Sequence, residues 1–91
     1  MPISVKFASP FRRHTGGTES IATTVATLPE LFADLEQRFP GLTKHLVNEN
    51  GDPRPFLNIY VNDEDIRFLG GKEYKFADKD EVLLLPSVAG G

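Results

Sequence analysis

The stretch EVLLLPSVAGG, residues 81–91, is the part of the chain from which the fold can be worked out. Its apolar run has the length of a strand and follows the turn residues Asp78-Lys79-Asp80, which is typical of a central strand covered on both faces. Pro86 ends this strand, because proline has no N–H to donate to a neighbouring strand. We therefore predict a buried final strand over Glu81–Leu85.

Residues 87–91 offer little that can pack, since they include one β-branched residue and two glycines. In an extended form they reach roughly 16–18 Å, at ~3.3–3.6 Å per residue. The terminal glycines would let the Gly91 carboxylate enter a channel too narrow for side chains. The Gly-Gly dipeptide also occurs at Gly16-Gly17 and Gly70-Gly71, where it is expected to form ordinary turns. The alternative interpretation is therefore that the terminal pair is an inert, disordered end. We expect a domain over residues 1–86 and a flexible tail over 87–91 whose working group is the Gly91 carboxylate.

The length and composition of the chain limit the classes of function. A chain of 91 residues makes one domain, which buries roughly 60–65% of its unfolded surface. The absence of cysteine excludes disulfides, thiolate metal sites and cysteine nucleophiles. No signal-like segment or membrane-spanning run is present, which predicts a cytoplasmic protein without membrane contact.

The charge is mildly negative, with a formal net charge of −3. The acidic residues cluster late, at Asp63-Glu64-Asp65 and within residues 78–81. This distribution argues against nucleic-acid binding and for a partner with basic patches, although charge clusters in turns are often only solvated.

The first part of the chain predicts a β-hairpin. Ile3, Val5 and Phe7 alternate with polar residues, which is the period of a strand with one buried face, and Pro10 closes it. Residues 9–18 form a long connection to a second strand near Glu19–Thr23.

Two groups of basic residues remain open in their interpretation. Arg12-Arg13-His14 precedes Thr15-Gly16-Gly17-Thr18 and either holds an anion beside glycine N–H groups or is a solvated loop. His14 and His45 have no carboxylate or second histidine at metal-ligand spacing, so neither is assigned metal or general-base chemistry.

The helix start is well marked. Thr27 is the predicted N-cap, Pro29 lies in the first turn, and Glu30 completes a capping box. The following apolar residues form one stripe that covers the sheet, and Pro40-Gly41 ends the helix. The stripe consists of Leu28, Leu31, Phe32, Leu35 and Phe39.

The second half of the chain contains further strands. Residues 42–47 predict a short helical turn and residues 48–55 a surface loop. Residues 56–62 then form the clearest strand, with a short strand expected at Ile66–Phe68 and a brief extended piece at Tyr74–Phe76. The order β-β-α-β-β-β predicts an α+β protein of the β-grasp (ubiquitin-like) class: a mixed sheet of four or five strands, one main helix across it, and the first and last strands paired in parallel.

These residues carry a resemblance that covers essentially the whole chain. The end of the chain, LLPSVAGG at residues 84–91, resembles the ubiquitin-like sulfur carriers of the MoaD/ThiS type, which include the small subunit of molybdopterin synthase and the thiamin sulfur carrier. The blocks RHTGG at 13–17 and NIYVNDEDIRF at 58–68 resemble the actinobacterial carriers of cysteine biosynthesis.

The resemblance implies a protein cosubstrate with no catalytic site, metal or bound cofactor of its own. An E1-like enzyme would use ATP to adenylate the Gly91 carboxylate, and sulfur would replace the adenylate to give a thiocarboxylate. A PLP-dependent cysteine synthase would accept the sulfur, and a JAMM-type metalloprotease would release cysteine. Gly90, Ala89 and Val88 would be the tail residues that these enzymes recognise.

Alternatives remain open at this point. The same carrier chemistry can serve molybdopterin, a secondary metabolite or tRNA, the tail can be joined to protein lysines, or the domain can be a binding module with an inert tail. If Glu81 points to solvent, Leu83 and Leu85 lie on the side of the sheet away from the helix, together with Tyr60. We predict a partner-binding face there, adjoining Pro86.

Overall fold

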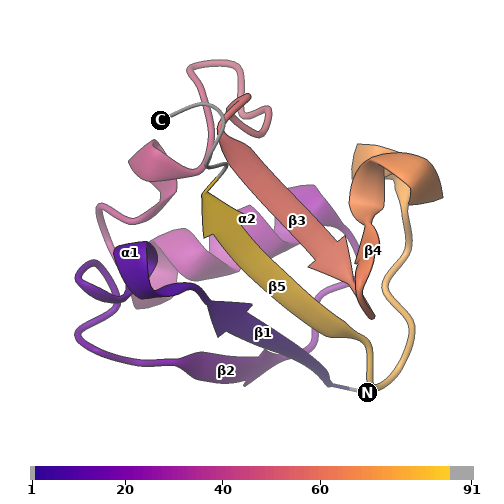
Figure 1. The fold of residues 1–91 in the computed structure, drawn as a ribbon, viewed down its shortest axis with the longest axis horizontal. Helices are drawn as coiled ribbons and strands as arrows, with labels where there is room; N and C mark the ends of the chain where they lie inside the picture. The colour runs from indigo at the N-terminus through magenta and orange to yellow at the C-terminus, as the bar shows by residue number, and fades with distance from the viewer. Residues whose placement is uncertain (1, 87–91) are drawn as a thin grey trace.

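The computed structural model describes residues 2–86, in which a five-stranded mixed sheet is crossed on one face by a single long helix (Figure 1). The strand order is β2-β1-β5-β3-β4. This is the predicted α+β, β-grasp arrangement. The elements are β1 Ile3–Phe7, α1 Ser9–Arg12, β2 Ser20–Thr23, α2 Leu28–Arg38, β3 Leu57–Val61, β4 Glu64–Asp65 and β5 Glu81–Pro86, with 3₁₀ helices η1 Thr43–His45, η2 Ile66–Leu69 and η3 Gly71–Glu73.

The final strand lies at the centre of the sheet. β5 pairs in parallel with β1, where Val5 lies opposite Val82, and in antiparallel fashion with β3, where Ile59 lies opposite Leu84. The predicted parallel pairing of the first and last strands is thus confirmed. Because two strands flank β5, its backbone position is fixed from both sides.

The core lies between this sheet and α2. The helix buries Leu28, Leu31, Phe32 and Leu35, as the stripe predicted, while Phe39 is only partly buried and packs edge-on against Phe7. The sheet contributes alternate residues of its three central strands. These residues are Ile3, Val5, Phe7, Leu57, Ile59, Val61, Val82 and Leu84.

The start of α2 differs from the predicted capping box. Thr27 is the N-cap residue, but its side chain makes no capping hydrogen bond. The Glu30 carboxylate accepts a hydrogen bond from the Ala26 N–H at 3.0 Å, one residue before the position that a capping box uses. The helix start was therefore predicted at the right residue, whereas its stabilising contacts were not.

One predicted element between β3 and β5 is wrong. The strand expected at Ile66–Phe68 is the 3₁₀ helix η2, because the Asp65 carboxylate accepts from the Arg67 N–H at 2.9 Å and turns the chain. The short strand paired with β3 is β4, two residues earlier in the chain. The brief extended piece expected at Tyr74–Phe76 agrees with the extended backbone of Tyr74, and it belongs to none of the strands of residues 2–86.

Two boundaries near the chain ends also need correction. The connection after β1 contains the helix α1, with Pro10 in its first turn, where proline lacks only an N–H that has no helical partner. Pro86 does not follow β5 but is its last residue, opposite Leu57.

The start of β5 is held by a buried carboxylate. Asp80 accepts hydrogen bonds from the Asn62 side chain at 2.9 Å, the Tyr74 hydroxyl at 2.7 Å and the Ala77 N–H at 2.8 Å. Asn62 in turn accepts from the Glu81 N–H at 2.9 Å. The network joins the turn after β3, the segment before β5 and the first residue of β5.

None of the helices within residues 2–86 has the length and hydropathy needed to cross a bilayer.

Candidate functional site

The predicted working end of the molecule is the end of β5. The Leu84 carbonyl accepts from the Ala8 N–H at 3.0 Å, and Pro86 lies opposite Leu57. The described chain therefore reaches position 86 in a fixed place between β1 and β3. Gly91, Gly90, Ala89 and Val88 lie outside the described residues, so their roles stay predictions, as does the division into a domain over 1–86 and a tail over 87–91.

The structure brings the predicted partner-binding residues onto one face. Tyr60 lies directly opposite Leu83, and Glu81 is exposed, so alternate residues of β5 point away from α2. Leu83 and Leu85 are only partly buried, whereas Val82 and Leu84 between them are 1% and 0% exposed. The expectation that β5 is covered on both faces is thus wrong. The face opposite α2 carries no second layer within residues 2–86, which leaves Leu83 and Leu85 accessible.

An exposed aromatic ring lies close to the same end of the sheet. Phe56 directly precedes β3 and is 52% exposed, next to Leu57, the residue opposite Pro86. Period-2 alternation placed Phe56 within the strand and gave no reason to single it out. Together with Leu85 and Pro86, Phe56 adds apolar surface where the described chain ends.

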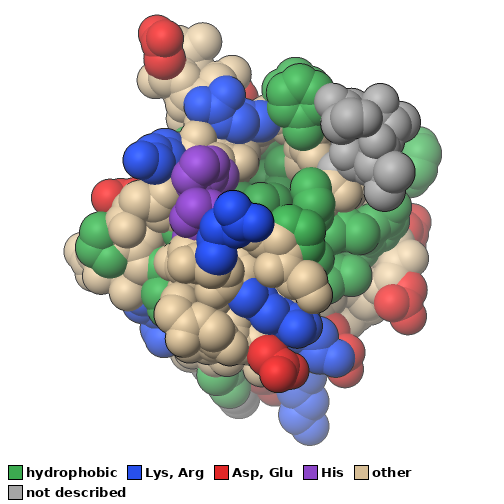
Figure 2. All heavy atoms as spheres, turned by 60° about the vertical axis from the view of Figure 1, so that its left-hand side comes forward, with side chains coloured by type: hydrophobic (Ala, Val, Ile, Leu, Met, Phe, Trp, Pro, Cys, Tyr) green, Lys and Arg blue, Asp and Glu red, His purple; other side chains and the backbone are tan. Residues whose placement is uncertain are grey.

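A group of basic residues borders this end, and we call it the basic cluster: Arg13, His14, Lys44, His45 and Arg54. The rings of His14 and His45 are stacked, with centroids 4.1 Å apart and planes inclined by 22°. Figure 2 shows the two histidines flanked by lysine and arginine side chains, with acidic side chains farther out. The sequence expectation that the histidines are isolated is therefore wrong.

The electrostatics of the basic cluster follow from this crowding. The pKa of His45 is lowered below 6.5 by burial, and then by the charges of His14, Lys44, Arg54 and Arg13. Stacked imidazoles present in-plane lone pairs that run side by side rather than converging, which is poor geometry for one metal ion. The cluster is suited to anionic groups instead.

The similarity to known proteins extends over nearly the whole chain. The model of the ThiS family matches residues 5–91, a range that includes the second half of β1, all the later strands and the terminal glycines. The chain belongs to the ThiS family.

Individual relatives of this ThiS family chain extend the match. The sulfur carrier protein CysO of Mycobacterium tuberculosis is 42% identical over 93 residues, with both chains fully covered. Its crystal structure has a TM-score of 0.85 at 40% identity and covers 94% of this chain and 99% of that one. The CysO chain of an Amycolatopsis orientalis BexX/CysO complex gives 0.86 at 43% identity and covers 98% of this chain and 99% of its own. Small archaeal modifier protein 3 of Haloferax volcanii is 32% identical over 94 residues, again with full coverage of both.

Two features of the ThiS family chain were missed by the sequence reasoning. The histidine stack joins the loop after α1 to η1, segments far apart in the chain, and no local pattern reports such a contact. Arg54 was treated as part of a surface loop, yet its Nε donates to the Lys44 carbonyl at 2.9 Å.

Proposed function

We propose that this chain is a sulfur carrier whose Gly91 carboxylate is activated and converted to a thiocarboxylate. The observation that carries the proposal is the family match through residue 91, together with a final strand that is paired on both sides and ends at Pro86, five residues before Gly91. A rigid base and a short tail deliver one carboxylate to a defined distance from the domain.

The chemistry needs an activating step, because a carboxylate is a poor electrophile. A Gly91 carboxylate oxygen attacks the α-phosphorus of ATP on an E1-like enzyme, and pyrophosphate leaves. A sulfide-level sulfur then attacks the acyl carbon, and AMP leaves with the bonding electron pair. The resulting thioacid anion is a good nucleophile at neutral pH. ATP serves the activating enzyme, and the carrier itself needs no bound cofactor.

We propose that the sulfur is used for cysteine biosynthesis. The 42% identity to CysO over the full length supports this use of the sulfur more than its transfer to molybdopterin, a secondary metabolite or tRNA. On a PLP-dependent cysteine synthase, the thiocarboxylate sulfur would replace the activated oxygen leaving group on the β-carbon of a serine-derived substrate. A JAMM-type metalloprotease would then add water across the acyl bond of the carrier–cysteine adduct, which releases cysteine and restores the Gly91 carboxylate. The carrier is a cosubstrate in each step.

A second candidate is a protein modifier joined through Gly91 to lysines. It is favoured by the similarity to small archaeal modifier protein 3 and to a ubiquitin-related modifier of Laccaria bicolor, which is 31% identical over 96 residues. Adenylation of Gly91 is common to both candidates, and they differ only in the nucleophile that takes the acyl group.

Intact mass spectrometry separates these candidates. The purified chain is incubated with ATP, a sulfide source and the E1-like enzyme of the same organism. A mass increase equal to exchanging one oxygen for sulfur supports the carrier, lysine adducts support the modifier, and an unchanged mass favours a binding module.

Matched variants test the position of the reacting carbon. Deleting Gly91, or adding one residue after it, moves the acyl carbon by ~3.5 Å. A displacement of ~1 Å already lowers rates on the order of a hundredfold, so both variants should fail while melting like wild type. Gly90→Val should fail for another reason, because a β-branched side chain does not fit a channel built for bare backbone. A folded Gly91 deletion that supports normal ATP–pyrophosphate exchange would refute the proposal.

A further inference from the structure

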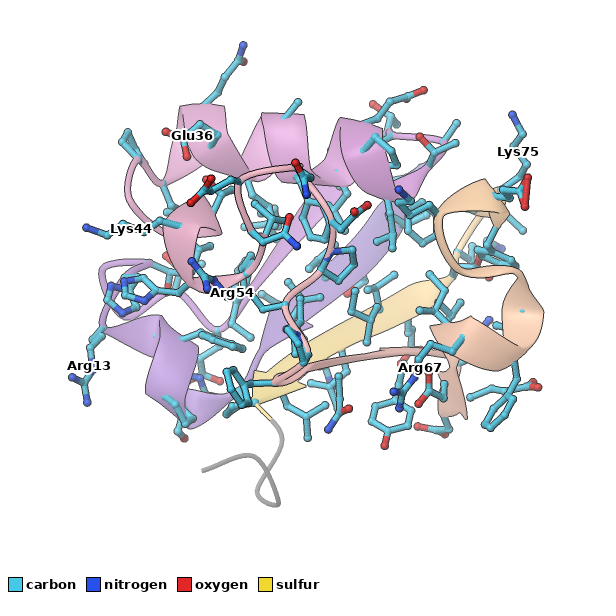
Figure 3. The ribbon with its side chains drawn as sticks, turned by 90° about the horizontal axis from the view of Figure 1, so that it is seen from above. Arg13, Glu36, Lys44, Arg54, Arg67 and Lys75 are labelled. Atoms are coloured by element: carbon cyan, nitrogen blue, oxygen red, sulfur yellow. The ribbon has the colours of Figure 1, made fainter. Side chains whose placement is uncertain are left out.

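The basic cluster is assembled from three separate segments rather than from one charged run. Arg13 and His14 come from the loop after α1, Lys44 and His45 from η1, and Arg54 from the segment before β3. In Figure 3, Arg13, Lys44 and Arg54 lie at one end of the molecule, whereas Arg67 and Lys75 lie at the other. Like charges repel, so gathering them has no folding advantage and calls for another explanation.

The cluster is held in place by the backbone. The Arg54 N–H donates to the Leu46 carbonyl at 2.9 Å, in addition to the bond from its side chain to the carbonyl of Lys44. On the other side, the Arg12 side chain donates to the Phe7 carbonyl at 3.0 Å, which fixes the loop that carries Arg13 and His14. These hydrogen bonds fix the backbone of the segments that carry the cluster, and the side chain of Arg54 with it.

Within residues 2–86, the arginine and lysine side chains of the cluster form no ion pair. The three ion pairs formed within residues 2–86 are Arg38–Asp34, Arg67–Asp65 and Lys72–Asp52. Arg13, Lys44 and Arg54 are exposed and belong to none of them. Their charges are therefore available to a molecule that binds at this end of the domain.

The cluster borders the strand that carries the tail. α1 packs against β5, and the Ala8 N–H bonds the Leu84 carbonyl on the β1 side. On the β3 side, the Leu57 N–H bonds the Arg54 carbonyl at 3.0 Å, and Leu57 lies opposite Pro86. An enzyme that takes hold of the chain beyond Pro86 must come close to the cluster.

We propose that the basic cluster is a docking site for an acidic surface of the enzyme that activates the carrier; this inference rests on the proposed function. Two hollows of the described surface are lined mainly by residues outside the cluster, and Arg54 is the cluster residue that borders one of them, so the cluster fits an extended protein surface better than a small anion. The net charge of −3 disfavours nucleic acid. Complementary charge raises the rate of encounter and fixes orientation.

Charge reversal with a matched control tests the docking site. Lys44→Glu and Lys75→Glu change the net charge equally, but only Lys44 belongs to the cluster, and Lys75 is also exposed and in no ion pair of residues 2–86. In ATP–pyrophosphate exchange at low salt, Lys44→Glu and Arg13→Glu should raise the KM for the carrier about tenfold with kcat nearly unchanged. Lys75→Glu should stay within about twofold of wild type. The difference should largely disappear at about 0.5 M NaCl, where the screening length is only a few ångströms.

Several results would overturn the inference. An unchanged KM for both Lys44→Glu and Arg13→Glu would refute the docking site and leave the proposed function untouched. An equal rise in KM for Lys75→Glu would also refute the docking site, because it would indicate an effect of net charge. Binding of single-stranded RNA to wild type and Lys75→Glu, but not to Lys44→Glu, would assign the cluster to nucleic acid instead. A wild-type chain that supports no exchange refutes the proposed function and this inference with it. Melting curves show whether each variant is folded.

Discussion

Replacing Asp80 by asparagine should destabilise the domain although it changes one atom. The carboxylate accepts from the Asn62 side chain on one oxygen, and from the Tyr74 hydroxyl and the Ala77 N–H on the other. Asparagine has a single acceptor oxygen. If that oxygen faces Ala77 and Tyr74, the new amide group meets the Asn62 amide, and rotating Asn62 leaves the Glu81 N–H without its acceptor. Every arrangement leaves a donor unpaired in a region where Asp80 is 5% exposed.

The expected loss in the free energy of unfolding of Asp80→Asn is that of one unsatisfied buried donor, about 1–3 kcal/mol. A domain of this length has a free energy of unfolding of roughly 5–14 kcal/mol, so the loss should be measurable by urea denaturation at neutral pH. Asp78→Asn is the control, because Asp78 is exposed and makes no side-chain hydrogen bond or ion pair within residues 2–86; its effect should be within about 0.5 kcal/mol. Equal urea midpoints for Asp80→Asn and Asp78→Asn would refute the reasoning.

The pH dependence provides a second test of Asp80. Burial raises its pKa, but hydrogen bonds from Ala77, Tyr74 and Asn62 outweigh burial, and the pKa lies below 3.8. A depressed pKa contributes stability that is fully present above 3.8 and is lost as the pH falls through the folded-state value. Wild type should lose this contribution below about pH 4, whereas Asp80→Asn should lack that part of the acid sensitivity.

Three further predictions concern the sheet face, one turn and the histidine stack. Leu83→Ser and Leu85→Ser should fold yet raise the KM for the activating enzyme about tenfold, and normal kinetics would exclude the partner-binding face. Lys79 has φ 71°, so Lys79→Gly should stabilise the domain by about 0.5–1 kcal/mol in thermal melts, whereas a similar gain from Lys79→Ala would contradict the backbone explanation. The lowered pKa of His45 makes stability decline as the pH falls below 6.5, and His45→Gln should show a smaller decline by urea titration; an identical decline would exclude His45 as its source.

The sequence predicted the layers of the fold because their signals are local. The alternation of Leu57, Ile59 and Val61, and the helical spacing from Leu28 onward, each report one buried face. The strand prediction at Ile66–Phe68 was wrong because three residues are too few to show a period. The hydrogen bond from the Arg67 N–H to the Asp65 side chain favours a 3₁₀ helix there instead.

The candidate site was predicted only in part. Tyr60, Leu83 and Leu85 were found because the strand period places them on one face. Arg13 and His14 were singled out as part of a basic triplet that could hold an anion, but their meeting with Lys44, His45 and Arg54 was not predicted. His14 and His45 meet through the packing of the loop after α1 against η1, which lie on opposite sides of α2 in the sequence. Contacts of this kind depend on the tertiary fold and leave no periodic signature.

The central position of β5 also determines how the domain responds to mechanical force. A pull on the chain beyond Pro86 acts along β5, which is hydrogen-bonded to β1 on one side and to β3 on the other. Such a load shears both rows of hydrogen bonds at once, whereas an edge strand such as β2 can be peeled away one bond at a time. Tension applied to the chain beyond Pro86 therefore loads the domain through the strand that has neighbours on both sides.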